Sequence, residues 1–204
     1  MTTTIFFLIV LLFSIVIHEV SHGSAANLLG DPTAKYAGRL TLNPIKHLDP
    51  FGSVILPILL LIFSGGRFAF GWAKPVPINP YNFRNPRWDE TKVAIAGPIS
   101  NLFLALIFGL AIRFLPLTNS LLTFFSIIAI ANLLLAIFNL VPIPPLDGSH
   151  ILFSLLPERF LNLKMVLQQY GLFILIFFLL FGLRFVFLGV MLIYYLITGQ
   201  PSLL

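Results

Sequence analysis

The sequence contains no cysteine and few charged residues. Cysteine is absent from all 204 positions, which excludes disulfide bonds and thiolate ligands, so any metal must be bound by histidine, carboxylate or water. Only 9% of the residues are charged while 58% are hydrophobic, and so few charges cannot cover a soluble surface. Because apolar runs recur from residue 5 to residue 197, most of the chain is expected to lie in a lipid bilayer.

A dense cluster of basic residues is also missing. The net charge is +5, but the lysines and arginines are spread between the apolar runs, which argues against nucleic acid as a partner. They are better explained as loop charges that orient a protein in a bilayer. The first apolar run follows Met1-Thr2-Thr3-Thr4 without a basic residue or a clear cleavage site, so it is interpreted as a retained helix rather than a signal peptide.

The apolar runs predict an all-α polytopic membrane protein with about four to six membrane segments. Full-length helices are predicted over residues 5–29, 93–115, 121–141 and 165–183. The first would be about 37 Å long at roughly 1.5 Å per residue, enough to cross a hydrocarbon core of about 30 Å. Two shorter apolar pieces, residues 54–63 and 185–198, are predicted to span, re-enter or lie at the interface.

The segments between these runs carry weaker signals. Alternating apolar residues at 39–43 predict a small re-entrant β element after the first helix. Residues 67–92 contain four prolines and are predicted to form a loop at the solvent side of the membrane or grazing it. A short helix is predicted to follow Asp147, with this residue as its N-cap, and to run to Leu156.

The orientation in the membrane depends on whether residues 54–63 change sides. If they do not, one face carries Lys35, Arg39, Lys46, Arg67, Lys74, Arg84, Arg87, Lys92, Arg159 and Lys164. Only Arg113 and Arg184 then lie on the other face. The positive-inside rule places the N-terminus outside and residues 31–92 in the cytoplasm. A complete crossing by residues 54–63 would make the division of charge much less clear.

Residues 18–22 form the motif His-Glu-x-x-His inside the first apolar run. His18 and His22 are four positions apart, so a helix projects both imidazoles from one face, close enough to bind one metal ion. Glu19 lies beside them, where a carboxylate can act as general base on water. Because ionisable groups are costly in an apolar helix, the motif predicts a zinc site rather than a polar patch between helices.

A catalytic zinc site needs a third protein ligand and an open position for water. Asp147 is the strongest candidate because it follows the predicted helix 121–141 and a proline-rich break, where irregular backbone near the membrane indicates a functional site. His150, three residues further on, is a ligand, a neighbour of the ligands or a surface residue. His47, in a polar loop, is interpreted as structural.

These residues resemble the site-2 family of intramembrane metalloproteases. The family pairs His-Glu-x-x-His with a distant Asn-x-x-Pro-x-Pro-x-Leu-Asp-Gly motif, which occupies residues 139–148 here. A third family element, Gly-Pro-x-x-Asn, occupies residues 97–101. Residues 38–44 and 72–77 look like the compact branch of the family, since the polar segments are too short for a PDZ or CBS domain.

The resemblance implies that His18, His22 and Asp147 bind one zinc ion per chain and that Glu19 is the catalytic base. Asn101 would then help to hold the substrate strand or to polarise its carbonyl, unless it only caps a helix contact. Asn139 is expected to form a structural hydrogen bond near the proline break. Many relatives continue with Gly and Arg after the Asp-Gly pair, whereas this chain has Ser149 and His150, which leaves the surroundings of the ligands open.

The resemblance also implies a single transmembrane metalloprotease domain over residues 1–204, with a core at 5–156 and C-terminal membrane segments at 165–198. The expected substrate is a transmembrane protein cut within or near its membrane segment, in the cell membrane of a prokaryote, with the active site towards the cytoplasm. A divalent-metal transporter and an inactive scaffold that binds transmembrane partners are the alternatives. The transporter would use the same His and Asp residues. The oligomeric state stays open.

Overall fold

The long apolar runs form helices. The computed structural model, which describes residues 2–63, 65, 71 and 73–201, contains α1 (Thr2–Leu28), α4 (Pro86–Phe114), α5 (Asn119–Asn139) and α7 (Leu161–Phe181). All four are long and apolar enough to cross a membrane. The predicted all-α architecture and its four full-length helices are therefore confirmed.

The helix α4 begins earlier than the sequence predicts, at Pro86 instead of residue 93. Proline is tolerated in the first turn of a helix because the N–H that it lacks would have no partner there. Asp89 lies in the same turn and accepts a hydrogen bond from the Asn85 N–H at 2.9 Å, which satisfies a free amide at the helix start. The loop predicted over residues 67–92 therefore ends at Asn85, and its residues 67–70 and 72 lie outside the described part of the chain.

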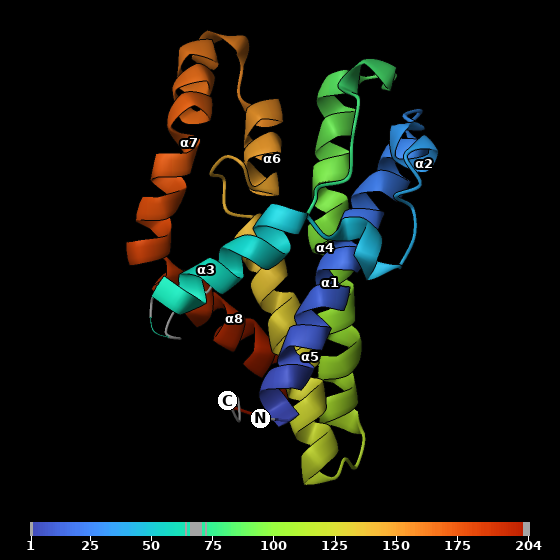
Figure 1. Cartoon of the computed structure of the whole chain (residues 1–204), viewed down its shortest axis with the longest axis vertical. Helices are drawn as coiled ribbons and strands as arrows, with labels where there is room; N and C mark the ends of the chain where they lie inside the picture. The colour runs from blue at the N-terminus through green and yellow to red at the C-terminus, as the bar shows by residue number, and fades with distance from the viewer. Residues whose placement is uncertain (1, 64, 66–70, 72, 202–204) are drawn as a thin grey trace.

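Helices α1, α4 and α5 pack together as the core that carries the site, and Figure 1 shows them running along the long axis. The buried face of α1 repeats every four residues at Ser14, His18, His22 and Ala26. The facing side of α4 is built mainly from small residues. Small residues let helix backbones approach closely, which is how transmembrane helices gain packing contacts in lipid.

Shorter elements complete the chain: α2 (Thr33–Tyr36), η1 (Pro44–His47), η2 (Pro50–Ile55), α3 (Leu56–Phe63), η3 (Pro80–Asn82), α6 (Asp147–Leu155), η4 (Glu158–Phe160) and α8 (Leu183–Thr198). In Figure 1, α3 and α8 run obliquely to the long helices. Helix α8 packs against α5 through Val190 and Tyr194, whose hydroxyl lies 2.7 Å from the Ser126 hydroxyl. The short apolar pieces thus differ from the four long helices in direction as well as in length.

The predicted β element at residues 39–43 is wrong. No strand occurs in the described ranges, and here side chains bond the backbone in a bent path. Arg39 is buried and donates from Nη2 to the Lys74 carbonyl at 2.6 Å, while the Asn43 side chain accepts from the Ile45 N–H and starts η1. The local bond of Asn43 competes with strand pairing. The bond of Arg39 is long-range, and alternation of apolar residues alone reveals neither of them.

The predicted N-cap role of Asp147 is also wrong. The helix α6 begins at Asp147 itself, and the N-cap position is Leu146, which makes no side-chain cap bond. A carboxylate in the first helical turn is still favoured by the helix dipole. Because it does not cap the helix, the Asp147 side chain is available for the site described next.

Candidate metal centre

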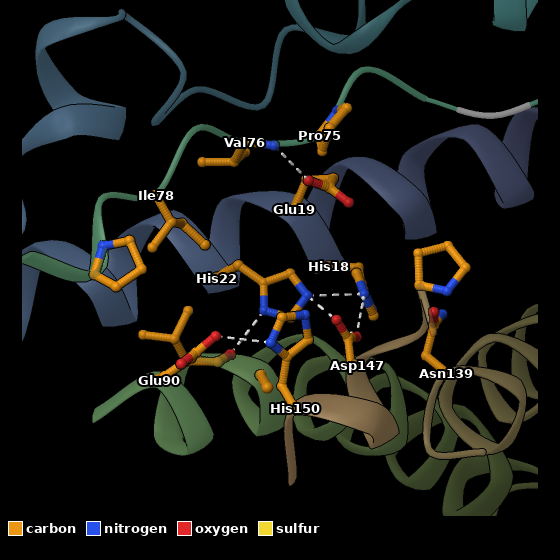
Figure 2. Close-up of a pocket in the computed structure, with 14 residues that line it drawn as sticks. His18, Glu19, His22, Pro75, Val76, Ile78, Glu90, Asn139, Asp147 and His150 are labelled. Atoms are coloured by element: carbon orange, nitrogen blue, oxygen red, sulfur yellow. Dashed lines mark hydrogen bonds and ion pairs between the residues drawn. The ribbon is translucent and has the colours of Figure 1, made fainter. Parts of the chain in front are cut away.

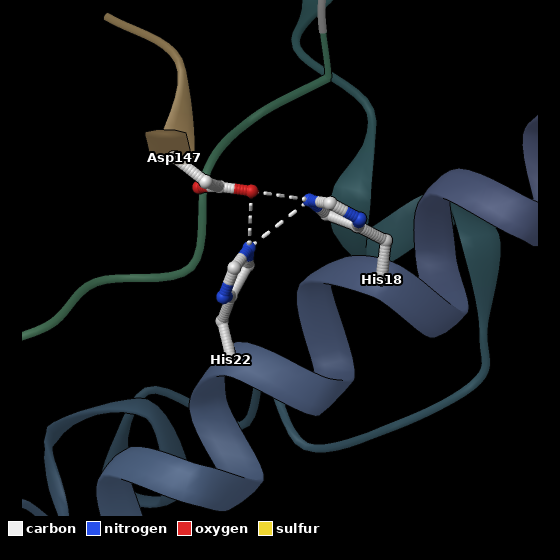
Figure 3. A group of neighbouring side chains, drawn as sticks. All are labelled: His18, His22 and Asp147. Carbon is white, nitrogen blue, oxygen red and sulfur yellow. Dashed lines mark hydrogen bonds and ion pairs between the residues drawn. The ribbon is translucent and has the colours of Figure 1, made fainter. Parts of the chain in front are cut away.

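Three side chains converge where α1 meets the start of α6 (Figure 3). The Nε2 atoms of His18 and His22 lie 3.0 Å apart, and the Asp147 Oδ2 atom lies 3.1 Å from the first and 3.3 Å from the second. Both histidines are buried. Within the described residues, these three form the only group of His, Asp and Glu side chains that could hold a metal.

The hydrogen bonds behind the two histidines fix their tautomers. His22 Nδ1 lies 2.7 Å from the Val93 carbonyl, which can only accept, so this nitrogen carries the proton. His18 Nδ1 lies 2.6 Å from Asn101 Oδ1, and the Asn101 amide nitrogen donates to Asn132 Oδ1. His18 therefore also carries its proton on Nδ1, and both Nε2 atoms present a lone pair to the centre.

Three acceptors consequently face one another without a proton between them. Asp147 Oδ2 is buried and accepts no hydrogen bond. Neighbouring donors around a four-coordinate zinc ion, with bonds of about 2.0–2.1 Å, are separated by roughly 3.3 Å. The distances of 3.0–3.3 Å match this spacing, and a cation would remove the repulsion among the lone pairs. The donor set and its spacing fit zinc.

Space for the two imidazoles is made by Gly97 on α4. A Cβ atom at this position would lie 2.7 Å from His18 Cε1 and still nearer to His22 Nε2, closer than real contacts allow. Pro98 follows and has no N–H to donate in the helix ladder. The Gly-Pro pair of the third motif therefore has a steric purpose, because α4 can pass beside the histidines only where it lacks a side chain.

Glu19 lines the same cavity, which has a volume of about 360 Å³ (Figure 2). Its Oε2 accepts a hydrogen bond of 2.8 Å from the Val76 N–H. Val76 belongs to a non-helical stretch of chain that passes over α1 (Figure 2). Val76 itself is buried, and its side chain packs close to Gly23. The carboxylate predicted to be the base is thus beside the metal group and is held by a backbone amide.

The other predicted residues fall in three different environments. Asn101 is fully buried and bonds His18, so the geometry favours a role in orienting the ligand over contact with a substrate. Asn139 lines the cavity, and its amide nitrogen donates to the Leu135 carbonyl at 2.9 Å within α5. His150 lines the cavity too and pairs with Glu90 at 2.8 Å.

His47 lies away from the metal group, as its interpretation as a structural residue requires. It is buried, and its Nε2 lies 2.9 Å from the Thr41 carbonyl. The loop acid Asp31 is fully buried and accepts hydrogen bonds from the Asn79 N–H and the Asn82 amide, so it ties the end of α1 to the segment before α4.

Four contacts of the site were not anticipated from the sequence. They involve Asn132, the Val93 carbonyl, the Val76 N–H and Glu90. Two are backbone groups, which carry no residue-type signal. Asn132 had one available signal, since it is a polar residue inside the apolar run 121–141, where such residues are expensive.

The fold and the centre together define a membrane metalloprotease. The chain belongs to peptidase family M50, the site-2 protease family, whose model matches residues 6–118 and 116–182. Among curated proteins it is 42% identical over 176 residues to "Putative zinc metalloprotease YwhC" of Bacillus subtilis, covering 81% of this chain and 76% of that protein.

Other relatives align over a smaller part of the chain. It is 34% identical over 145 residues to "Putative zinc metalloprotease Rip2" of Mycolicibacterium smegmatis, which covers 67% of this chain and 52% of the relative. A protein named "Putative zinc metalloprotease MJ0611", from Methanocaldococcus jannaschii, is 44% identical over 66 residues, 31% of this chain and 34% of that one. No solved structure matches significantly. The family and these relatives identify the protein as an integral membrane zinc protease.

Proposed function

We propose that the chain is an intramembrane zinc endopeptidase that hydrolyses a peptide bond within or beside a transmembrane segment of another membrane protein. The observation that carries the proposal is the depth of the centre in α1. His18 lies about 24 Å from the start of the helix at roughly 1.5 Å per residue, and large apolar side chains such as Leu8 and Phe13 are exposed on the way. A helix with such an apolar outer face lies in lipid, so His18 and His22, which are part of it, lie within the membrane as well.

His18, His22 and Asp147 would hold the zinc ion. The ion supplies Lewis acidity, which lowers the pKa of water and polarises the scissile carbonyl. Both histidines keep their protons on Nδ1, bound to Asn101 Oδ1 and the Val93 carbonyl, so their rings cannot rotate away from the centre. The residues thus provide a rigid, pre-oriented set of three ligands.

Glu19 would move the proton. The Val76 N–H fixes its Oε2, and Oε1 is the atom proposed to take a proton from the attacking water and pass it to the leaving amine. The amine receives the proton as the C–N bond breaks, and the carboxylate is regenerated.

A substrate helix hides its carbonyls in internal hydrogen bonds and must unwind before attack. The chain offers irregular backbone beside the centre, because α5 ends at Asn139 and α6 starts only at Asp147. Pro145 and Asn139 from this break line the cavity. An unwound substrate segment is proposed to lie there, beside the non-helical residues 140–146 that join α5 to α6.

The proposed orientation puts the N-terminus outside and the centre towards the cytoplasm. The start of α1 and the end of α8 lie towards one end of the long axis in Figure 1, while α2 and the end of α6 lie towards the other end, next to the connectors that carry most of the basic residues. The oblique path of α3 supports the assumption that residues 54–63 do not change sides. Because the relatives come from bacteria and an archaeon, we place the protein in a prokaryotic cell membrane.

The proposal is tested by co-expressing a panel of single-span membrane proteins with the wild type and with Glu19→Gln, with bound zinc measured in both. We expect cleavage of at least one panel protein by the wild type, none by Glu19→Gln, and equal zinc content. Cleavage by the variant at the wild-type rate would remove Glu19 from the mechanism. Zinc flux into proteoliposomes, equal for both proteins, would instead support the metal transporter, which family membership disfavours.

A further inference from the structure

One pair of titratable side chains in the cavity, His150 and Glu90, has no part in the mechanism above. His150 Nδ1 lies 2.8 Å from Glu90 Oε1, joining α6 to α4. Both side chains are about half exposed, at 45% and 41%, and both line the cavity that contains Glu19 and the metal group. A surface ion pair of this kind contributes little to stability, so its position in the cavity calls for another explanation.

The helix α6 directs His150 to the same side as Asp147. The two residues are three positions apart, so they project from one face, and Figure 2 shows the His150 ring reaching into the cavity between Glu90 and the metal group. The Glu90 carboxylate accepts a hydrogen bond from the Nδ1–H of His150, so Nε2 is the ring nitrogen that remains for a ligand in the cavity. His150 and the metal group line the same cavity of about 360 Å³, so we expect this atom to be within reach of a peptide bound at the centre.

We propose that His150 is a catalytic residue of the protease, which donates a hydrogen bond from Nε2–H to the scissile carbonyl oxygen as that oxygen becomes negative, and that Glu90 is the positioning residue that holds its ring. The inference rests on the proposed function. His150 forms no covalent bond and keeps its proton, while the proton of the attacking water still passes through Glu19 to the amine. A fixed donor at a developing oxyanion accelerates acyl transfer without any reorganisation.

Because the Nδ1–H of His150 is hydrogen-bonded to Glu90, Nε2 carries a hydrogen only when both ring nitrogens are protonated. Nε2 can therefore donate only while His150 is an imidazolium. The hydrogen bond to Glu90 raises the pKa of His150 above its usual range, with burial acting in the opposite direction. The charged groups that face it are Glu90 on α4, Asp147 on α6 and His22 on α1, with Glu19 in the same cavity. The donor is therefore present at low pH and is lost as the pH rises through the pKa of His150.

The test compares wild type, His150→Gln, Glu90→Gln and the double variant on the panel protein that the wild type cleaves and Glu19→Gln does not. We expect kcat to fall about a hundredfold in His150→Gln, with KM changed little, as for loss of one oxyanion donor. In Glu90→Gln the fall of kcat at alkaline pH should begin at a lower pH, because the carboxylate that raises the pKa of His150 is gone. The double variant should match His150→Gln. The control is Lys92→Gln, which breaks the Lys92–Asp89 ion pair on α4 and should behave as wild type.

A second readout needs neither substrate nor metal. Diethyl pyrocarbonate acylates only the neutral imidazole, so the rate at which it modifies the peptide carrying His150, followed by mass spectrometry, should rise at neutral pH in Glu90→Gln. Equal rates in both proteins would show that Glu90 does not hold the proton on His150 and would overturn the proposal.

A merely structural bridge would give a different pattern. His150→Gln and Glu90→Gln would lower the melting temperature and the zinc content together, and the pH dependence of kcat would stay as in the wild type. That result overturns the inference while leaving the proposed function intact, since Glu19→Gln would still be inactive. If His150→Gln does not fold, the shift of the alkaline decline in Glu90→Gln decides.

Discussion

Asn101 offers the sharpest test of how the centre is built. Its side chain is fully buried and accepts from His18 Nδ1 at 2.6 Å, while its amide nitrogen donates to Asn132 Oδ1 at 2.9 Å and to the Ser14 carbonyl at 3.2 Å. Substitution by leucine removes all three bonds. It leaves the His18 N–H and the Asn132 oxygen buried without a partner, at about 1–3 kcal/mol each, or about 2–6 kcal/mol of stability in all.

The loss of these hydrogen bonds should lower zinc affinity as well as the stability of the fold. Without an acceptor behind it, the His18 ring loses its fixed orientation, and removal of such a partner typically lowers metal affinity about ten- to a hundredfold. Asn101→Asp separates the two effects, since a carboxylate still accepts from His18 but cannot donate to Asn132. We expect Asn101→Leu to lose both stability and zinc affinity, and Asn101→Asp to lose stability but to keep its zinc.

The assay is chelator competition for zinc on purified protein in detergent, with a thermal melt of each sample. Ser100→Ala is the matched control, because the Ser100 hydroxyl bonds only the Gly97 carbonyl of its own helix, at 2.7 Å. It should match the wild type in both measurements. Wild-type zinc affinity in Asn101→Leu, or equal losses in Asn101→Leu and Asn101→Asp, would refute the role assigned to this residue.

Three further outcomes follow from the contacts. Asp147→Ala should abolish stoichiometric zinc binding, and full retention of zinc by chelator competition would exclude it as the third ligand. Gly97→Ala should lower zinc affinity at least tenfold, because its Cβ would take the space of the His22 ring, and unchanged affinity would show that α4 can move aside. Burial raises the pKa of Asp31, but hydrogen bonds from Thr33, the Asn79 N–H and Asn82 together lower it more, so the pKa lies below its usual value. The stabilisation from Asp31 is therefore present above the unfolded-state pKa and is lost as the pH falls through the folded-state pKa. Asp31→Asn should lower the free energy of unfolding by about 1.5–3 kcal/mol at neutral pH. Its melting temperature should also fall less than that of the wild type as the pH is lowered, and an equal fall in both proteins would contradict this.

The sequence predicts the long helices well because their signal is local. A run of apolar residues long enough to cross lipid has few alternatives, and the runs that became α1, α5 and α7 were assigned to within a few residues. The sequence did not predict the start of α4, because proline is typical of loops and Pro86 was therefore assigned to one. Proline is also common as the first residue of a helix. The failed β element shows the opposite case, where the long-range contact from Arg39 to Lys74 decides the backbone path.

The metal group was foreseen for a similar reason. His18 and His22 are related by helical spacing, and the fold places Asp147 beside them as the second motif implied. The groups that orient them are harder to foresee, because the Val93 carbonyl and the Val76 N–H belong to the backbone and become partners only when helices pack. His150 illustrates the limit, since its pairing with Glu90 depends on how α6 docks on α4.

The central claim is that Glu19 and the zinc group cut peptide bonds inside the membrane. The most direct measurement maps, by mass spectrometry, the new chain ends of membrane proteins in cells that express the wild type or Glu19→Gln. We predict new ends within apolar, membrane-spanning segments, present with the wild type and absent with the variant and after zinc chelation. New ends confined to soluble loops, or identical ends with Glu19→Gln, would contradict it.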